Sequence, residues 1–99
     1  MKPDLKGGIA AISLAGRDKG RAFMVLCPVD AQFVLVCDGR NRPVAKPKKK
    51  RRKHLMPTRH EMPELAAKYA QNRLRDEEIR AFLQTVRPSD DAPQPEYPA

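Results

Sequence analysis

The residues in this sequence best able to do chemistry are its cations, many of which lie in one short block. Lys46 to Lys53 reads Lys-Pro-Lys-Lys-Lys-Arg-Arg-Lys, so seven of these eight residues are cationic. Dense positive charge binds phosphate groups, because each ionic contact to a polyanion releases counterions. The block also repels itself, so we expect a charged loop rather than a packed element unless a counter-charge is present. A nuclear localisation signal and a solvated loop without a partner are the alternatives.

A second group of cations lies in a turn between two apolar runs. Gly16 and Gly20 bracket this turn, and glycine accepts the positive φ that tight turns often require. The flanking runs predict a β-hairpin with a polar tip. Asp18 is expected to accept hydrogen bonds from neighbouring turn amides. Arg17 and Lys19 then point into solvent, where they suit a phosphate backbone.

Further candidates follow the same logic. Asp38-Gly39 predicts a second tight turn, which Arg40 and Arg42 flank. His54 follows the basic block and is expected to stack on a base or contact a phosphate. The predicted RNA-binding residues are Arg17, Lys19, Arg21, Arg40, Arg42, Lys46, Lys48, Lys49, Lys50, Arg51, Arg52, Lys53 and His54. The predicted structural turn residues are Gly16, Asp18, Gly20 and Gly39.

Other reactive residue types do not form a recognisable site. Cys27, Cys37, His54 and His60 lack the paired spacing of a structural zinc site. The two cysteines are expected to be small core residues without a disulfide. No nucleophile, base and acid occur in a catalytic pattern, and no glycine-rich phosphate loop precedes a helix. We therefore expect neither an enzyme nor a bound metal or cofactor.

Short apolar runs predict the elements that must position these cations. Strands are expected at residues 9–14, 22–27, 32–37, 42–46 and 54–56, with Pro28 ending the second. Strands this short, joined by tight turns, favour a small closed β-barrel.

Helical periodicity takes over after the predicted strands. Pro63 suits the first turn of a helix, which Asn72 is expected to break. The apolar face of this helix consists of Leu65, Ala66, Tyr69 and Ala70. A second helix begins near Asp76, has the apolar stripe Ile79, Phe82, Leu83 and Val86, and ends before Pro88. Residues 88–99 are proline-rich and acidic, and we expect them to be disordered.

Composition narrows the class of partner. The net charge of +8 favours a polyanion, and it is unevenly distributed: residues 1–59 hold fifteen Lys and Arg against four acids, whereas residues 60–99 hold five against eight. Aromatic residues are only 5% of the chain, which favours recognition of RNA backbone and shape over base stacking. No apolar run approaches the roughly 20 residues of a membrane span, and the start lacks the apolar region of a signal peptide. A cytoplasmic location is expected.

The turn and the residues around it resemble a known family. Gly16-Arg17-Asp18-Lys19-Gly20, with Phe23 and Val25 in the following strand, is similar to the Gly-x-x-Lys-Gly turn of the KOW motif. Asp38-Gly39 and the Lys-Pro-Lys-Lys-Lys stretch before His54-Leu55 extend the likeness to about residues 5–60. The chain thus resembles short bacterial KOW proteins, which in turn resemble a large-subunit ribosomal KOW protein of archaea and eukaryotes. This resemblance implies an SH3-like barrel that binds ribosomal RNA.

Three hypotheses remain open. The first is a ribosomal or ribosome-associated protein that binds structured RNA of the large subunit. The second is an SH3-like module that docks on a transcription or translation complex, and the third is a nuclear or DNA-associated protein with an import signal. The expected organisation is a mainly β barrel over residues 1–60, a helical extension over 61–87 and a tail over 88–99. Neither a membrane nor a small-molecule substrate is expected as a partner.

Overall fold

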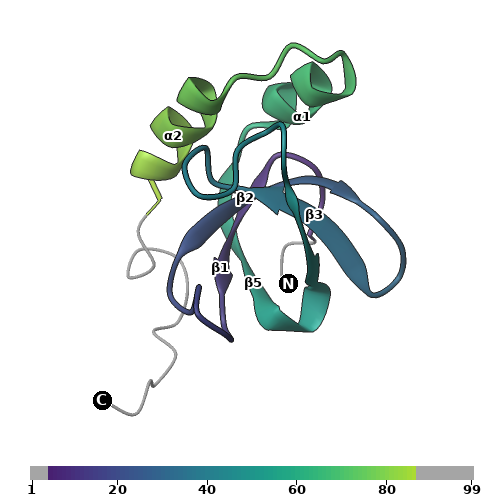
Figure 1. Ribbon diagram of the computed structural model, residues 1–99, viewed down its shortest axis with the longest axis vertical. Helices are drawn as coiled ribbons and strands as arrows, with labels where there is room; N and C mark the ends of the chain where they lie inside the picture. Colours follow the sequence, from purple (N-terminus) through teal and green to yellow (C-terminus); the bar gives the residue numbers. More distant parts are fainter. Residues whose placement is uncertain (1–4, 87–99) are drawn as a thin grey trace.

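The computed structural model describes residues 5–86 and is mainly β, with two helices after the strands (Figure 1). The strands are β1 (Ile9–Ser13), β2 (Ala22–Pro28), β3 (Phe33–Cys37), β4 (Lys48–Arg51) and β5 (Leu55–Glu61). The helices are α1 (Pro63–Ala70) and α2 (Asp76–Gln84), and a 3-10 turn, η1 (Arg52–His54), joins β4 to β5. The predicted mainly β fold with two C-terminal helices is confirmed. The predicted tail, residues 88–99, lies outside the described residues.

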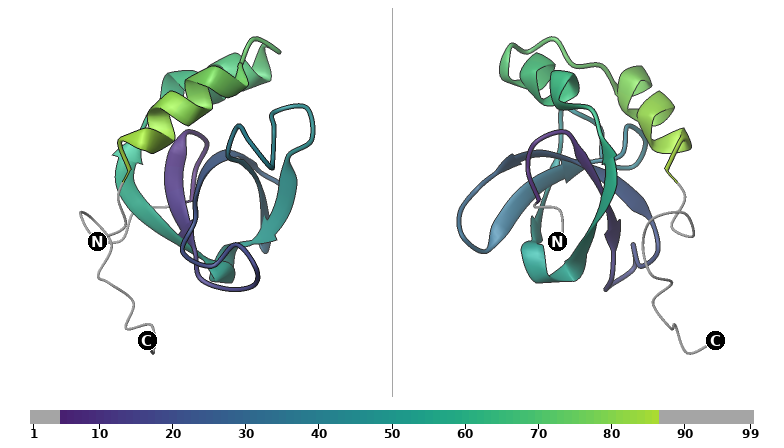
Figure 2. Two further views of the ribbon diagram at one scale, coloured as in Figure 1. Left: turned by 60° about the vertical axis from the view of Figure 1, so that its left-hand side comes forward. Right: turned by 180° about the vertical axis from the view of Figure 1, so that it is seen from behind.

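The strands form one antiparallel sheet. Its order is β4-β3-β2-β1-β5, so the basic strand β4 is one edge and β5 the other. The sheet curves strongly (Figure 2). Hydrogen bonding among residues 5–86 nevertheless leaves the sheet open, so the predicted closure into a barrel is not seen.

The curved sheet is buried on both faces, which explains why all five residues of β1 are buried. One face packs against the helices and forms the helix-side core: Ala10, Ile12, Met24, Leu26, Cys37, Leu65, Leu74, Ile79, Phe82 and Val86. The other face lies inside the curve and forms the inner core: Ile9, Ala11, Phe23, Val25, Val34, Val36 and Leu55. Because side chains alternate along a strand, neighbouring residues of β1 enter different cores.

Both helices begin where the sequence predicted, at Pro63 and Asp76, but α2 ends at Gln84, before the stop that was predicted at Pro88. Pro63 is the first residue of α1, and Asn72, just beyond that helix, has a φ of 58°. Ile79, Phe82 and Val86 of the predicted second stripe are buried in the helix-side core. Helix α2 is also tied to the β3–β4 loop, because Asp76 Oδ1 accepts a hydrogen bond of 2.7 Å from the Val44 amide. The helices therefore cover one face of the sheet (Figures 1 and 2).

Two strand predictions were wrong. Residues 42–46 are a loop, and the strand that pairs with β3 begins at Lys48, inside the block that was expected to be a charged loop. The last strand does not stop before Pro57 but continues to Glu61, with Pro57 opposite Ala11. A proline is tolerated there because β5 is an edge strand and one side of its backbone has no ladder partner.

Candidate nucleic-acid interface

Asp18 joins the two basic segments that the sequence indicated separately. Its Oδ2 accepts a hydrogen bond of 3.1 Å from Lys48 Nζ and lies 3.9 Å from Lys50 Nζ. The sequence predicted that turn amides would bind this carboxylate, whereas the structure pairs it with lysines of β4. This pairing supplies the counter-charge that the basic block requires.

Backbone hydrogen bonds close the hairpin turn that holds Asp18. The Gly20 amide donates to Ser13 O at 2.8 Å, and the Arg21 amide donates to Asp18 O at 2.9 Å. Gly16 and Gly20 have φ values of +78° and +87°, as predicted for turn glycines. The turn thus presents the exposed residues Arg17, Lys19 and Arg21 beside the start of β4.

The cations of β4 alternate between the two faces of the sheet. Lys48 and Lys50 lie opposite Val36 and Val34, two residues of the inner core. Lys49 and Arg51 are exposed and lie on the other face, opposite Leu35 and Phe33. A run of cations can form a strand because the aliphatic stems of lysine and arginine cover apolar surface while their charged ends reach solvent or a counter-ion.

Lys50 is the most enclosed of these cations. Its side chain is only 8% exposed, and Nζ lies 5.6 Å from the centre of the Phe23 ring. Burial and the charges of Lys48 and Arg42 lower the pKa of Lys50, while Asp18 opposes that shift. Lys50 is therefore part of the fold's interior and a poor candidate for phosphate contact, which corrects its assignment to an open basic loop.

The outward-facing cations of β4 surround one aromatic ring. Lys49 Nζ and the Arg51 guanidinium carbon lie 4.7 and 5.1 Å from the centre of the Phe33 ring. Cation–π attraction orients both side chains without neutralising their charge. The two residues lie two positions apart on one face of the strand, about 7 Å along its axis. Such a row is suited to contact phosphates of one nucleic-acid chain.

The remaining predicted residues of the block differ in how they are held. Arg52 is partly buried: its Nε donates to Asp30 O at 3.2 Å and its amide donates to Gln32 O at 2.9 Å. Lys46 and Lys53 are exposed, whereas His54 is partly buried. The His54 carbonyl accepts a 2.8 Å hydrogen bond from the Leu14 amide, which holds η1 beside the hairpin. We call residues 17–19 together with residues 48–53 the basic edge.

The second predicted turn is also formed. Asp38 Oδ1 accepts hydrogen bonds of 2.8 Å from the amides of both Arg40 and Arg42. Gly39 has a φ of +77°, and its carbonyl accepts a 2.7 Å hydrogen bond from Arg80 Nη1 of α2. Sequence reasoning missed Arg80, because only the folded chain brings this helix position to a turn 41 residues earlier.

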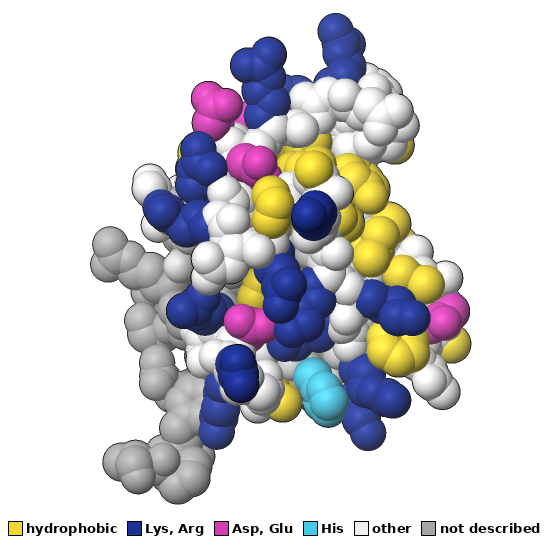
Figure 3. All heavy atoms as spheres, viewed as in Figure 1, with side chains coloured by type: hydrophobic (Ala, Val, Ile, Leu, Met, Phe, Trp, Pro, Cys, Tyr) yellow, Lys and Arg dark blue, Asp and Glu magenta, His cyan; other side chains and the backbone are white. Residues whose placement is uncertain are grey.

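Basic side chains dominate much of the face seen in Figure 3. Lysine and arginine occupy its centre and left, with a few acids among them, while hydrophobic side chains form a band to the right. The structure thus brings the tip and the basic block together.

The structure describes both cysteines and both histidines of the chain. Both cysteines are free thiols, and burial raises the pKa of the Cys37 thiol to about 12, with Asp76 and Asp38 adding to the shift. Among residues 5–86, no group of three or more His, Cys, Asp or Glu side chains is placed to hold a metal ion. No helix in the part of the chain that the structure describes is both long and apolar enough to cross a bilayer.

Comparison with known proteins leaves the likeness to KOW proteins as a prediction from the residues alone. No family model matches the chain, and no curated protein matches it.

The free energy of unfolding should fall at low pH, in part because protonation of Asp18 removes its contact with Lys48 and Lys50. Burial alone would raise the pKa of Asp18, but the hydrogen bond from Lys48 and the charges of Lys48, Lys50 and Arg42 lower it below 3.8. A carboxyl with a lowered folded-state pKa stabilises the fold above its unfolded pKa, and this contribution is lost as the pH falls through the folded-state value. The parent should therefore lose more stability than Asp18→Asn between pH 7 and about pH 3.

Urea unfolding at both pH values measures this difference. Glu64→Gln, which changes an exposed carboxyl in the first turn of α1, is the matched control for the loss of one carboxylate. Equal losses of stability in the parent and in Asp18→Asn would show that the Asp18 contact does not contribute to the fold.

Proposed function

We propose that this protein binds structured RNA, and specifically ribosomal RNA of the large subunit, through phosphate contacts along the basic edge. The observation that carries this proposal is the meeting of the hairpin tip and β4 at Asp18. It places the hairpin tip, which carries the exposed residues Arg17 and Lys19, beside Lys48 and Lys50 on the inner face of β4, while Lys49 and Arg51 extend the positive charge over the other face of the same strand. One continuous basic surface can then follow a phosphate backbone.

The proposal includes the finer fold assignment, an SH3-like barrel of the KOW type. The strong curvature of the antiparallel sheet and the glycine-bracketed turn between β1 and β2 support it. Closure would require the edge strands β4 and β5 to approach each other, and η1 already joins them directly in sequence. The ribosomal assignment rests on the resemblance of residues 16–20 and their surroundings to KOW proteins.

Recognition of folded RNA is favoured over recognition of unpaired bases. Proteins that bind single strands usually stack bases on exposed aromatic rings. Here Lys49 and Arg51 lie over the Phe33 ring, and Phe23 is fully buried. The basic edge therefore offers charge rather than stacking platforms, which suits backbone and shape recognition.

The nuclear-import alternative is less well supported, because part of the basic block is folded into the sheet. Four of its residues, Lys48–Arg51, form a strand paired with β3. A receptor that reads a linear signal needs a free extended segment, whereas here Lys50 is buried.

A protein-docking function is the second candidate, because the structure offers a hollow that no residue of the basic edge lines. This hollow has a volume of about 330 Å³ and lies between the β3–β4 loop and the end of α1. Its lining residues are Val44, Ala45, Pro47, Tyr69, Asn72 and Leu74. An SH3-like module would use such a surface to bind a protein segment.

Two binding measurements separate RNA binding from protein docking. The full chain should bind an rRNA hairpin more tightly than a single-stranded RNA or a DNA duplex of equal length, measured by fluorescence anisotropy at one fixed salt concentration. It should also sediment with large ribosomal subunits at moderate salt. Equal affinity for all three probes would contradict specific binding of structured RNA. Absence from the subunit pellet would remove the ribosomal assignment and favour protein docking.

A further inference from the structure

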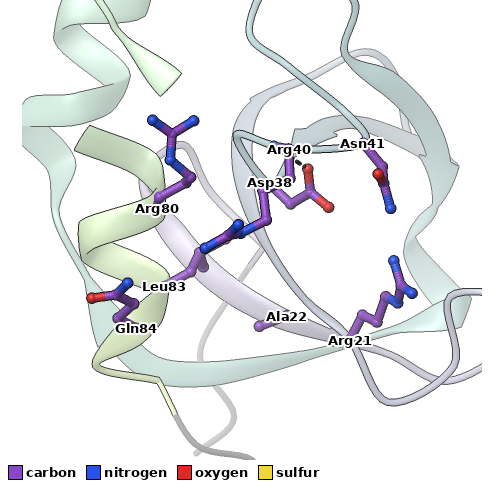
Figure 4. Close-up of a pocket in the computed structure, with 8 residues that line it drawn as sticks. All are labelled: Arg21, Ala22, Asp38, Arg40, Asn41, Arg80, Leu83 and Gln84. Atoms are coloured by element: carbon purple, nitrogen blue, oxygen red, sulfur yellow. Dashed lines mark hydrogen bonds between the residues drawn. The ribbon is translucent and has the colours of Figure 1, made fainter. Parts of the chain in front are cut away.

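A second positively charged feature lies beside the basic edge, where α2 passes the β3–β4 loop. A hollow of about 480 Å³ opens there (Figure 4). Arginines from three separate segments border it: Arg21 from the hairpin, Arg40 from the second turn and Arg80 from α2. We call these three residues and the hollow the arginine notch.

The position of Arg80 is set by contact between α2 and the turn. Arg80 Nη1 donates to the Gly39 carbonyl at 2.7 Å, which fixes one end of the guanidinium. A side chain at Gly39 would come within 2.7 Å of Asp76 O and 2.9 Å of Arg80 Cγ, so only glycine allows this approach. The remaining N–H groups of Arg80 are left to serve a ligand, since a guanidinium carries five donors.

The charge of the arginine notch is largely uncompensated. Among residues 5–86, no carboxylate forms an ion pair with Arg21, Arg40 or Arg80. Asp38 also lines the hollow, but its Oδ1 is engaged by the backbone amides of Arg40 and Arg42. The hollow is thus bordered by three arginines and one aspartate. An anion would find several donors and a net positive charge there.

The rest of the lining indicates the kind of anion. Ala22 and Leu83 provide apolar surface, while Asn41 and Gln84 provide amide groups that both donate and accept hydrogen bonds. A phosphate attached to a sugar would use this mixture, since the guanidiniums suit the phosphate and the amides suit hydroxyl groups. Arg21 follows directly after the glycine turn, so the notch is continuous with the basic edge.

We propose that the arginine notch binds a phosphodiester group of the RNA chain and that α2 is thereby part of the RNA interface. This inference rests on the proposed function, because it requires RNA on the basic edge. It gives the C-terminal helices a binding role in addition to covering the sheet.

Salt titrations of three single variants test the proposal on an rRNA hairpin. Arg80→Gln and Arg40→Gln should each weaken binding and flatten the plot of log affinity against log salt by about one unit. Arg73→Gln is the matched control, because Arg73 is exposed in the linker between the helices and does not line the notch. It should leave the salt dependence at the parent value.

Two different substitutions in the notch are needed, because weaker binding by one variant could result from a disturbed fold rather than from a lost phosphate contact. Arg80→Gln removes the hydrogen bond to Gly39, so its thermal melt is recorded alongside. The Arg40 side chain is exposed and makes no such contact, so Arg40→Gln tests the notch independently. In NMR spectra of the parent, the Arg80 Nε–Hε signal should also shift when the RNA hairpin is added.

The outcomes distinguish this inference from the proposed function. A parent protein without salt-dependent binding to the RNA hairpin overturns both. A parent that binds normally, with Arg40→Gln and Arg80→Gln both indistinguishable from Arg73→Gln, overturns the arginine notch alone.

Discussion

Replacing Lys49, Arg51 and Lys53 together with glutamine should flatten the salt dependence of RNA binding by about two to three units of log affinity per log salt. All three side chains are exposed, and the first two lie on the outward face of β4. Each lost phosphate contact removes a slope of about 0.7–0.9. Glutamine retains much of the aliphatic stem, and Lys48 and Lys50 keep their contacts with Asp18, so the fold should be preserved.

The matched control removes the same charge elsewhere. Arg59, Arg73 and Arg75 are exposed on β5 and in the linker between the helices, and none belongs to the basic edge. Changing these three to glutamine should leave the slope much closer to that of the parent. If both triple variants lower the slope equally while circular dichroism shows both folded, affinity follows net charge and the basic edge has no special role.

Replacing Ile79 with alanine should destabilise the whole domain by about 2–5 kcal/mol, the usual cost of emptying a fully buried aliphatic site. Ile79 is fully buried between α2 and the sheet, in the same core as Ala10, Ile12 and Met24. This loss is a large fraction of the stability of a typical small domain. Urea unfolding followed by circular dichroism measures it.

The control for Ile79→Ala is Glu77→Ala on the same helix. Glu77 is exposed in the first turn of α2, so its removal should cost less than about 1 kcal/mol. If Ile79→Ala unfolds at the same urea concentration as the parent, α2 is not an integral part of the domain core. The helix could then not hold Arg80 against the second turn.

Local signals predicted much of the fold. Gly16, Gly20 and Gly39 have the positive φ values that their turns suggested, and Pro63 begins the first helix. Each of these depends on one residue's backbone preference, which a sequence shows directly. The spacing of Ile79 from its apolar neighbours in the second helix is likewise visible in the sequence.

The strand β4 could not be predicted because the reasons for it are not local. All four residues of β4 are cations, so the sequence does not show which of them point toward the inner core and which point toward the other face. The counter-charge, Asp18, lies 30 residues before Lys48, and the partner strand β3 supplies the hydrogen-bonding ladder. Self-repulsion was therefore the only effect visible in the sequence, and it favoured a loop.

The sequence indicated which residue types make up the candidate site, but not which of these side chains are enclosed and which are exposed. Sequence reasoning treated Lys48, Lys49 and Lys50 as equivalent, whereas the fold encloses Lys50 and exposes Lys49. It also missed Arg80, because the contact with Gly39 depends on how α2 crosses the turn.

The most direct test of RNA binding through the basic edge is a salt titration of the parent protein on an rRNA hairpin. The account predicts a linear fall of log affinity with log salt, with a slope of about −3.5 to −4.5 if Lys49, Arg51, Lys53, Arg40 and Arg80 each contribute one phosphate contact. A slope near zero, or no measurable binding at low salt, would contradict it, because every phosphate that a lysine or arginine neutralises releases counterions from the RNA.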